Sequence, residues 1–581
     1  MLSHIVAIIL FSQVSGEIAV RPDTAKIPIS RYVFGSGDEM TASFSPLGQT
    51  QPLIAATKPS LLRFGGIGAE YLNWEADSFG GLMYLDFVDT FIIPIQVNFG
   101  VDSFLRLCEA IDAEPILTVN MQTSDIYLAG RMVEYANGDT TTPMGHLRAQ
   151  RGHPAPYNVK IWSLGNEPDI AGGQFPVPPF GYWTFYRHFL LPFSSWAWDD
   201  STFWTAQTFS DLIPLYTNEM DSNSPIPLEF IFSIAGNPAW VRPVVQPNID
   251  RLDYLDVHYY PYFAWDSIMD TTAYIQALMR TDTIFPAESY VQMFRDSLNA
   301  IGAGSIKTIV LEYNAGIIMI PDRFWWNYLC GLFVADCIGH WMHAGLPMAG
   351  VYSIHEGSPS SSDFPYFGII RGDTVSRRMP SHVLELYNTY FGDTLIYSSS
   401  NQKNSGYGIE CWASKRSSDR KYAMVIVNKS LDTTYTMSLK IKDTLVVMHY
   451  YDITNNAPLA APYNGTTGIV DHGTMFPDSV RQGWTYLTYD FAPASIALFE
   501  ATPWYGIEES AIRINGSNTL PTVIKKGACL KLPLGDYALY SITGARITQW
   551  KKVTEIRIPD VPRGVYFFKT TRSAFRKIII Y

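Results

Sequence analysis

The chain has 581 residues, with 42 Lys or Arg against 54 Asp or Glu, and a formal net charge of −12. Hydrophobic residues make up 47% and charged residues 17%, which excludes a disordered chain, and no compositional repeat points to a fibre. The acidic balance argues against a nucleic-acid partner, because such a partner requires a basic face. At roughly 100–200 residues per domain, the length predicts two to four domains.

The N-terminal segment, residues 1–16, is predicted to be a signal peptide. An apolar run at 5–11 precedes Val14-Ser15-Gly16, which offers a cleavage point, although the segment before the run contains neither Lys nor Arg. A buried N-terminal strand is the alternative interpretation. Residues 17–30 are expected to add a strand to a later β-sandwich.

Between residues 31 and 380, short β-branched runs alternate with helical stretches, which is the pattern of βα units. Several of these runs end in a polar residue, as in a (β/α)8 TIM barrel, whose active site is built from the C-terminal ends of its strands. We therefore predict a (β/α)8 TIM barrel, with a doubly wound open sheet as the alternative. The expected strands are 32–34, 60–64, 115–120, 159–164, 228–234, 255–259, 308–312 and 350–355.

The rest of the chain predicts β-structure. From about residue 385 the helical period disappears, so 381–502 predicts an antiparallel β-sandwich and 503–581 a small C-terminal β-sandwich domain. The apolar stretch 324–348 is interrupted by Asp336, His340 and His343, which favours a buried helix over a membrane span. No third metal ligand for the two histidines is evident in the sequence, so packed or solvated histidines are favoured.

Two glutamates occupy the ends of predicted barrel strands. Glu167 follows strand four in the sequence Gly165-Asn166-Glu167-Pro168, and Glu312 ends strand seven. Strands four and seven face each other across a barrel mouth, so their carboxylates can flank one bond. Glycoside hydrolysis needs this pair, because one carboxyl protonates the leaving oxygen while the other attacks or activates water. A surface carboxylate is the alternative for either residue alone.

These residues resemble those of the clan A retaining glycoside hydrolases. Asn166-Glu167 resembles the acid/base signature of strand four, and Glu312 resembles the nucleophile of strand seven. Within the clan, residues 98–116, 133–138 and 147–162 resemble family 51, the α-L-arabinofuranosidases. The resemblance implies release of α-L-arabinofuranosyl residues from plant hemicellulose by double displacement, an oligo- or polysaccharide substrate, and neither cofactor nor metal.

The resemblance also implies roles for further residues. Arg63 resembles the arginine beside the nucleophile, where it would keep Glu312 ionised. Glu167 would have a raised pKa and act first as acid and then as base, with its carboxyl about 5–5.5 Å from that of Glu312. The substrate-binding candidates are Arg63, Asn166, His258, Tyr260, Glu39 and Asn120.

One position departs from the family pattern. Where the pattern has an asparagine that touches the furanose, this chain has Ile67. The runs around Arg63 and Glu167 also resemble family 79, the heparanase and β-glucuronidase relatives. A heparanase-like β-glucuronidase, a β-xylosidase, an endoglucanase and a non-catalytic surface glycan-binding protein therefore stay as alternatives, and the oligomeric state stays open.

The C-terminal residues resemble a different type of domain. Segments 537–546 and 556–569, together with the Lys-Ile-Ile-Ile run at 577–580, resemble a type IX secretion sorting domain. This resemblance implies a Gram-negative protein, secreted or at the cell surface by an outer-membrane route, whose C-terminal domain contacts the secretion machinery. A carbohydrate-binding sandwich is the alternative.

Overall fold

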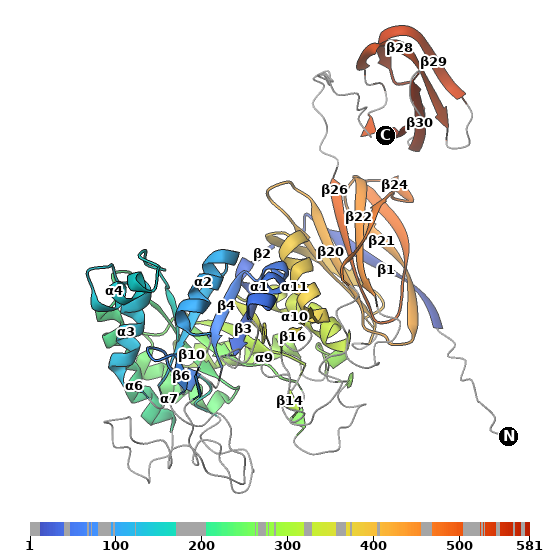
Figure 1. Ribbon diagram of the computed structural model, residues 1–581. Helices are drawn as coiled ribbons and strands as arrows, with labels where there is room; N and C mark the ends of the chain where they lie inside the picture. Colours follow the sequence, from blue (N-terminus) through green and yellow to red (C-terminus); the bar gives the residue numbers. More distant parts are fainter. Residues whose placement is uncertain are drawn as a thin grey trace, which may run out of the picture. The chain divides into compact units, whose positions relative to one another are not determined.

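The chain divides into two units, residues 1–502 and 503–581 (Figure 1). The computed structural model describes most of both, and residues 1–11, which hold most of the expected signal peptide, lie outside the described part. The described residues are 12–39, 47–66, 69–70, 72–79, 95–96, 99–121, 124–169, 205–261, 263–264, 275–276, 278–283, 286–315, 317–318, 328–355, 368–371, 375–403, 407–454, 468–503, 523–524, 527, 529–541, 546–561, 564–570 and 576–580.

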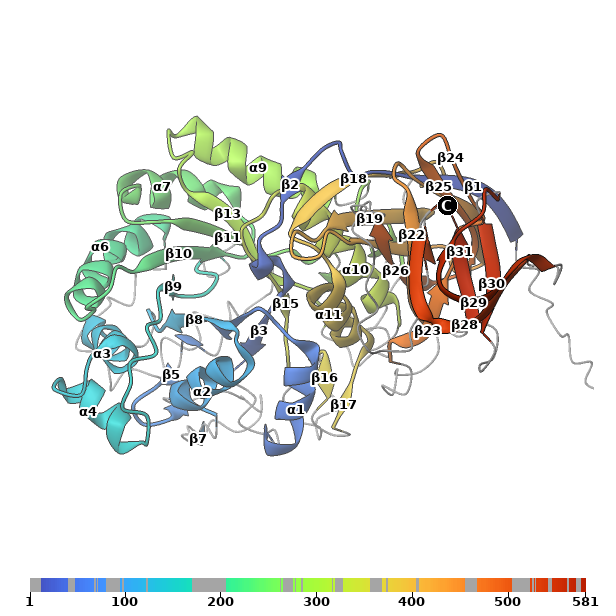
Figure 2. The ribbon, with the colours of Figure 1, turned by 90° about the horizontal axis from the view of Figure 1, so that it is seen from above.

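A closed barrel of parallel strands forms the first part of unit one, and this confirms the predicted (β/α)8 fold (Figure 2). Seven of its strands overlap runs predicted from the sequence. Glu167 follows the fourth strand and Glu312 lies on the seventh, as expected. The barrel strands are β3 (Gly35–Glu39), β4 (Leu61–Gly65), β8 (Glu114–Val119), β9 (Ile161–Leu164), β10 (Glu229–Ile234), β11 (Tyr254–Val257), β13 (Lys307–Tyr313) and β15 (Ala349–Tyr352).

The prediction for the first strand was wrong in position. Residues 32–34 lie in a 3-10 helix, η1 (Arg31–Phe34), which begins where the Ser30 side chain accepts a hydrogen bond from the backbone N–H of Tyr32. The strand follows as β3, whose small residues allow close approach: a Cβ on Gly35 would lie 2.8 Å from the carbonyl oxygen of Ala349. A strand of Gly and Ser has no β-branched signal that a sequence pattern could detect.

Helices cover the outside of the barrel, and α2, α3, α6, α7 and α9 surround its strands in Figure 2. Among the described residues, none of the helices has the length and apolar composition that crossing a bilayer requires. The helices are α1 (Leu47–Thr57), α2 (Val101–Ile111), α3 (Ile126–Asn137), α4 (Pro143–Gln150), α6 (Ala206–Ser222), α7 (Val241–Val245), α9 (Ala287–Ala300), α10 (Tyr328–His343) and α11 (Met379–Tyr390), with short 3-10 helices η4 (Pro238–Trp240) and η5 (Gln246–Asn248).

The barrel interior is layered, apolar below and polar above. Because side chains alternate with a period of two, residues two positions apart on one strand occupy successive layers. The apolar layer contains Leu61, Ile116, Ile161, Ile231 and Tyr254. Two residues further along the same strands lie Arg63, Thr118, Ser163, Ser233 and Asp256, all of them buried. A polar floor therefore lies directly beneath the mouth of the barrel.

A curled, mostly antiparallel sheet of 11 strands completes unit one. Its strand β20 is buried along its whole length, because Val425 and Val427 join the barrel-side core while Met424 and Ile426 join the core of the sandwich. The strands are β1 (Ser12–Arg21), β2 (Ile27–Pro28), β18 (Thr394–Ser400), β19 (Ile409–Lys415), β20 (Tyr422–Asn428), β21 (Thr433–Ile441), β22 (Leu445–Thr454), β23 (Val470–Met475), β24 (Ser479–Arg481), β25 (Trp484–Phe491) and β26 (Ser495–Pro503).

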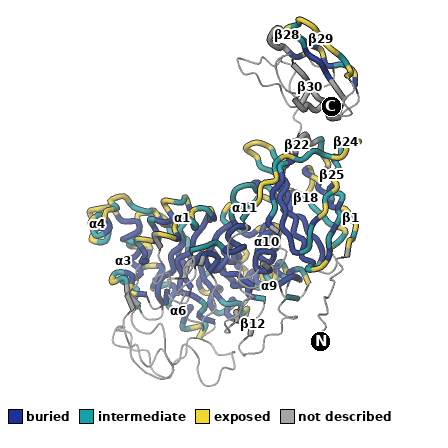
Figure 3. The backbone as a smooth tube through the Cα atoms, turned by 45° about the vertical axis from the view of Figure 1, so that its right-hand side comes forward, coloured by how far each residue is buried: buried dark blue, intermediate teal, exposed yellow. Residues whose placement is uncertain are grey.

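The N-terminal strand β1 holds the residues expected to join the sandwich. It pairs antiparallel with β18 and parallel with β21, and its first pairing joins Ser12 to Thr433. The strand thus begins inside the segment predicted as a signal peptide, and the buried residues of β1 are Ile18 and Val20. Figure 3 shows buried backbone running through both the barrel and this sandwich.

Short strands and a separate sheet complete the described structure. Unit two is a five-stranded sheet with its own small core around Leu539 and Ile556. Its strands are β27 (Val523–Ile524), β28 (Cys529–Ser541), β29 (Arg546–Arg557), β30 (Gly564–Thr570) and β31 (Arg576–Ile580). In unit one, two-residue strands form small sheets: β5 (Leu72–Asn73), β6 (Ser78–Phe79) and β7 (Ile95–Gln96); β12 (Phe263–Ala264) and β14 (Ile317–Ile318); β16 (Ile370–Arg371) and β17 (Ser376–Arg377).

Candidate active site

Glu167 is presented by a tight left-handed turn at the end of β9. Gly165 has φ 68° and Glu167 itself has φ 47°, a backbone conformation that is uncommon for a residue with a side chain. The backbone N–H of Glu167 donates to the carbonyl of Ser233 at 3.2 Å, which ties the turn to β10. Non-glycine residues held at positive φ are concentrated at functional sites.

The carboxylate of Glu70 holds this turn in place through hydrogen bonds with the backbone. It accepts hydrogen bonds from the backbone N–H of Asn166 at 2.5 Å and from that of Met121 at 2.9 Å. A Cβ on Gly165 would lie 2.6 Å from the same carboxylate, so the turn has no room for a side chain there. Glu70 therefore joins the ends of β8 and β9. Glu70 was not predicted from the sequence, because a loop glutamate carries no periodic signal.

Glu312 enters the mouth through an irregularity in β13. Ile309 and Leu311 face the barrel interior, while Val310 and Tyr313 belong to the outer core. Strict alternation would place Glu312 outside, but the pairing of β13 with β15 shifts register between Val310 and Tyr313. Such bulges redirect side chains next to active sites, and this one turns the Glu312 carboxylate inward.

Two side chains, Arg63 and Tyr260, donate hydrogen bonds to the buried Glu312 carboxylate. Arg63 donates to Oε1 at 2.8 Å, and the hydroxyl of Tyr260 donates to Oε2 at 3.0 Å. The second guanidinium nitrogen of Arg63 donates to Oδ1 of Asn166 at 2.8 Å. Burial, the largest influence, raises the pKa of Glu312; His258 and Arg63 lower it, and Glu167 raises it further. Arg63 thus acts in the expected direction, toward the ionised form, but it does not cancel the effect of burial on the pKa.

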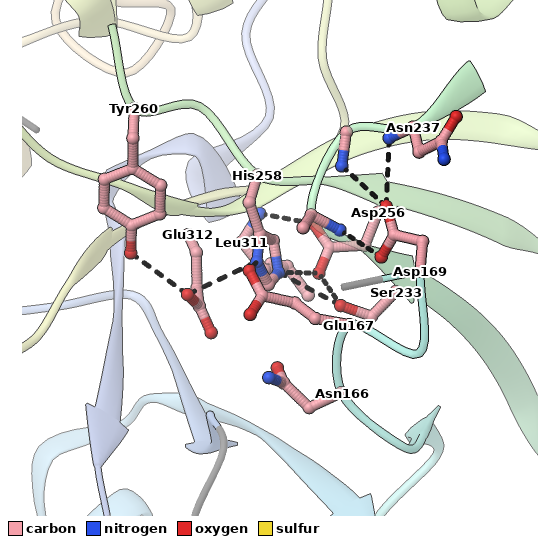
Figure 4. A network of polar contacts seen from close by, with 12 residues as sticks. Asn166, Glu167, Asp169, Ser233, Asn237, Asp256, His258, Tyr260, Leu311 and Glu312 are labelled. Atoms are coloured by element: carbon pink, nitrogen blue, oxygen red, sulfur yellow. Dashed lines mark hydrogen bonds and ion pairs between the residues drawn. The ribbon is translucent and has the colours of Figure 1, made fainter. Parts of the chain in front are cut away.

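His258 connects the two glutamates (Figure 4). Its Nδ1 lies 2.5 Å from Oε1 of Glu167 and 3.3 Å from Oε2 of Glu312. One oxygen of each glutamate lies within 4.8 Å of the other. Oxygens this close favour the short carboxyl separation of retaining glycosidases, ~5–5.5 Å, over the ~6.5–9.5 Å of inverting ones. The arrangement can protonate a leaving group and attack the same carbon.

The same three residues offer donor atoms for a metal ion, all within 4.8 Å of one another. The imidazole Nδ1 is already in direct contact with both carboxylates, so these atoms face each other instead of a shared centre. A bound metal at ~2.0–2.2 Å from each ligand would require them to move apart. The geometry therefore favours a hydrogen-bonded network.

Asp256 and Ser233 hold the other edge of His258. Nε2 lies 3.2 Å from Oδ2 of Asp256 and 3.0 Å from Oγ of Ser233, whose hydroxyl donates to Asp256 at 2.8 Å. Burial alone would lower the pKa of His258, but Glu312, Glu167 and Asp256 raise it well above its ordinary value. The sequence analysis missed Asp256, although a charged residue two positions before His258 in an apolar strand was a usable signal.

Asp169, two residues after Glu167, secures the neighbouring loop. Its carboxylate accepts from the backbone N–H groups of Ala235 at 2.8 Å, Gly236 at 3.1 Å and Asn237 at 2.9 Å. Burial raises the pKa of Asp169 to about 6, against the lowering effect of these hydrogen bonds. Figure 4 shows it on the far side of Glu167 from Glu312.

The structure brings together six of the candidate residues, namely Glu167, Glu312, Arg63, Asn166, His258 and Tyr260. Asn120 lies buried just after β8, where its amide donates to the carbonyl of Leu72 at 3.2 Å. Glu39 ends β3 and pairs with Gly65, while its side chain lies outside the described part. Ile67 also lies outside the described residues.

Sequence comparisons place arabinofuranosidase-like sequence in the first half of the barrel. Residues 54–187 match the model of the α-L-arabinofuranosidase 1 domain. The chain is 46% identical over 70 residues to α-L-arabinofuranosidase C of Emericella nidulans, and 35% identical over 85 residues to the intracellular exo-α-(1→5)-L-arabinofuranosidase of Acetivibrio thermocellus. These alignments cover 12% and 15% of this chain, and only 14% and 16% of the two relatives.

Structural comparisons extend the likeness to the whole of unit one at the level of the fold. An α-L-arabinofuranosidase from Thermotoga maritima, solved with arabinose, aligns with TM-score 0.63 and 19% identity, over 84% of this chain and 99% of that one. A family 44 xyloglucanase from Paenibacillus polymyxa aligns with TM-score 0.57 and 13% identity, over 84% of this chain and 100% of that one. A barrel followed by a sandwich is therefore an architecture shared by several glycoside hydrolases.

Proposed function

We propose that the protein is a retaining glycoside hydrolase that releases α-L-arabinofuranosyl residues from plant hemicellulose. The observation that carries the proposal is the pair Glu167 and Glu312, whose oxygens come within 4.8 Å at the ends of the fourth and seventh barrel strands. The match of residues 54–187 to an arabinofuranosidase domain supports the choice of sugar. That segment contains Arg63, Asn166 and Glu167.

The geometry supports a double displacement. Glu312 attacks the anomeric carbon as the bond to the leaving oxygen breaks, and Glu167 gives its proton to that oxygen. Glu167, now ionised, then accepts a proton from water as the water oxygen displaces Glu312 and regenerates both carboxyl groups. Arg63 and Tyr260 hold the Glu312 carboxylate in place through both steps.

The test is a panel of aryl glycosides, with the anomeric configuration of the first-formed product read by NMR. We expect wild type to hydrolyse the α-L-arabinofuranoside with retention. In Glu167→Ala, an activated aryl leaving group should still react in the first step, so a burst of phenol precedes slow turnover, while Glu312→Ala should abolish turnover. Inversion, or equal loss in both variants on every substrate, would contradict the proposed roles.

Ile67 bears on the identity of the sugar, because it replaces an asparagine of the family pattern. An apolar contact of this size discriminates by only ~1–3 kcal/mol, so it does not dictate another sugar. We expect arabinofuranoside to be accepted with a weaker preference over xylosides, and Ile67→Asn to raise kcat/KM for the arabinofuranoside. Faster cleavage of an aryl glucuronide by wild type would favour the β-glucuronidase alternative, and oligosaccharide binding without any cleavage would favour a glycan-binding protein.

We further propose that unit two is a type IX sorting domain and that the protein is secreted or at the cell surface. Support comes from the sequence segments 537–546 and 556–569 and from the separate core of this unit. A chain ending at Thr502 should keep glycosidase activity but stay inside a host that has the secretion system. Export of the truncated chain at the wild-type level would contradict this assignment.

A further inference from the structure

Asp256 is a buried carboxylate that contacts Nε2 of His258, while the two glutamates face Nδ1 of the same ring. It lies on β11 in the polar floor of the barrel, with 0% of its side chain exposed. Its Oδ1 accepts from the backbone N–H of Leu311 at 2.7 Å, and its Oδ2 accepts from Ser233 at 2.8 Å and lies 3.2 Å from Nε2 of His258. Figure 4 shows these contacts behind the imidazole ring, away from Glu312.

The place of Asp256 on β11 does not by itself require an acidic side chain. One layer below on the same strand lies Tyr254, part of the apolar interior, and a buried charge is unfavourable unless it is paired. The cations acting on Asp256 are His258, which contacts it directly, and Arg63, which acts through space. A carboxylate at this place is therefore explained by its effect on the imidazole.

The charges around His258 define which of its nitrogens carry protons. Glu167 and Glu312 face Nδ1 from β9 and β13, while Asp256 faces Nε2. Arg63 from β4 and Asp169 from the loop after β9 also act on this network, and the hydroxyl of Tyr290 on α9 donates to the His258 carbonyl at 2.6 Å. A neutral ring protonated at Nε2 would turn the lone pair of Nδ1 toward two carboxylates, whereas a ring protonated at both nitrogens donates in both directions.

We propose that Asp256 is a positioning residue that keeps His258 doubly protonated, with its Nδ1–H directed at Glu167. This inference rests on the proposed glycosidase function. The Nδ1–H occupies Oε1 of Glu167 at 2.5 Å, which leaves Oε2 to carry the proton that is transferred. That proton passes from Oε2 to the leaving oxygen, and in the second step water returns one to Oε2. His258 keeps both of its protons and stabilises the ionised form of Glu167 between the steps.

The test is Asp256→Asn, which keeps the size of the side chain and an oxygen able to accept from Leu311. The state of the His258 ring is read by ¹⁵N NMR of labelled histidine from pH 5 to 9. We expect an imidazolium at pH 7 in wild type and a ring that loses its second proton at lower pH in the variant. The kcat for the aryl arabinofuranoside should fall roughly 10²-fold with KM little changed. The alkaline limb of the kcat profile, which reports loss of the second His258 proton, should move to lower pH, because the imidazolium loses the carboxylate beside its Nε2.

Asp253→Asn is the matched control. Asp253 directly precedes β11 and accepts from the backbone N–H of Phe230 at 2.8 Å, at the opposite end of the strand from His258. We expect this variant to keep the wild-type ring titration and kcat. A neutral His258 ring in wild type at pH 7 would overturn the proposal even if Asp256→Asn does not fold, as would a variant with wild-type titration and kcat. Wild type that cleaves no glycoside would refute the proposed function, while the ring measurement still decides the role of Asp256.

Discussion

The Tyr260 hydroxyl is a single atom on which the reactivity of Glu312 depends. It donates to Oε2 at 3.0 Å, and a hydrogen bond to a charged group contributes ~1.5–3 kcal/mol. We expect Tyr260→Phe to lower kcat/KM about 10- to 100-fold. Because the hydroxyl stabilises the ionised form of Glu312, its loss should raise a pKa that burial has already raised, so the acid limb of the pH profile should move to higher pH by about one or two units.

Tyr313→Phe provides the control for this prediction. Tyr313 is adjacent to Glu312, yet its buried hydroxyl has no hydrogen-bond partner among the described residues. Removing that hydroxyl should leave kcat/KM and the acid limb unchanged, and should not lower the free energy of unfolding. Steady-state kinetics from pH 4 to 9 on both variants distinguish the two outcomes. An unshifted acid limb in Tyr260→Phe would show that this hydroxyl does not stabilise ionised Glu312.

The functional residues at the strand ends could be predicted from the sequence, but the direction in which their side chains point could not. Glu167 and Glu312 were found because polar residues interrupt apolar runs at the ends of predicted strands, whereas Arg63 and Tyr260 were predicted from the family resemblance. Alternation alone would have turned Glu312 away from the mouth, and only the register shift of β13 against β15 explains its position. Glu70 and Asp169 were missed because they hold backbone N–H groups of distant segments, a role that leaves no pattern in a single sequence.

At the scale of elements, the turn after β9 determines where the acid/base candidate stands. A side chain in the left-handed region costs ~1–2 kcal/mol, and a Cβ on Gly165 would in addition lie 2.6 Å from Oε1 of Glu70. We expect Gly165→Ala to lower the free energy of unfolding by more than the conformational cost alone. Because Glu70 must move and it holds Asn166, kcat/KM should fall at least about tenfold, since a 1 Å misplacement of reacting groups can cost 10²-fold.

Gly302→Ala separates the two effects. Gly302 also has a positive φ, 78°, in the turn after α9, but no described atom lies within 4 Å of a Cβ built there. This variant should lose only the conformational ~1–2 kcal/mol in urea unfolding and keep its kcat/KM. Equal losses of stability and activity in both variants would mean that the contact with Glu70 does not matter.

The order of elements followed from periodicity, and the exceptions have physical reasons. Seven barrel strands were found from apolar runs, whereas β3 was misplaced because glycine and serine allow its close packing against β4 and β15. The continuous apolar run of β20 did not indicate which side chains face which core, because one face of the strand packs on the barrel side and the other on the sandwich.

At the scale of unit one, a buried charge network joins the barrel to the sandwich. Lys429, at the end of β20, lies 2.8 Å from Oδ2 of Asp336 on α10 and 3.4 Å from Oε1 of Glu410 on β19. The indole of Trp412 donates to Oδ1 of Asp336 at 3.2 Å. Burial would raise the pKa of Asp336, but Lys429 and His340 hold it well below its usual range. The ammonium group thus compensates two acids, one from each side of the junction.

Replacing Lys429 tests whether this junction makes the barrel and the sandwich unfold together. Removal of one partner from a buried ion pair typically costs ~3–5 kcal/mol, because the remaining charge stays unpaired. We expect Lys429→Met to lose about this much and to split one urea transition into two. Adding Asp336→Asn and Glu410→Gln should recover most of the loss, since no buried charge is then left alone.

Lys421→Met is the control, because it breaks a partly exposed ion pair with Glu500 at 2.8 Å. This variant should cost at most ~1 kcal/mol. A loss in Lys429→Met no larger than in Lys421→Met would mean that the junction is held by its apolar contacts and not by this network.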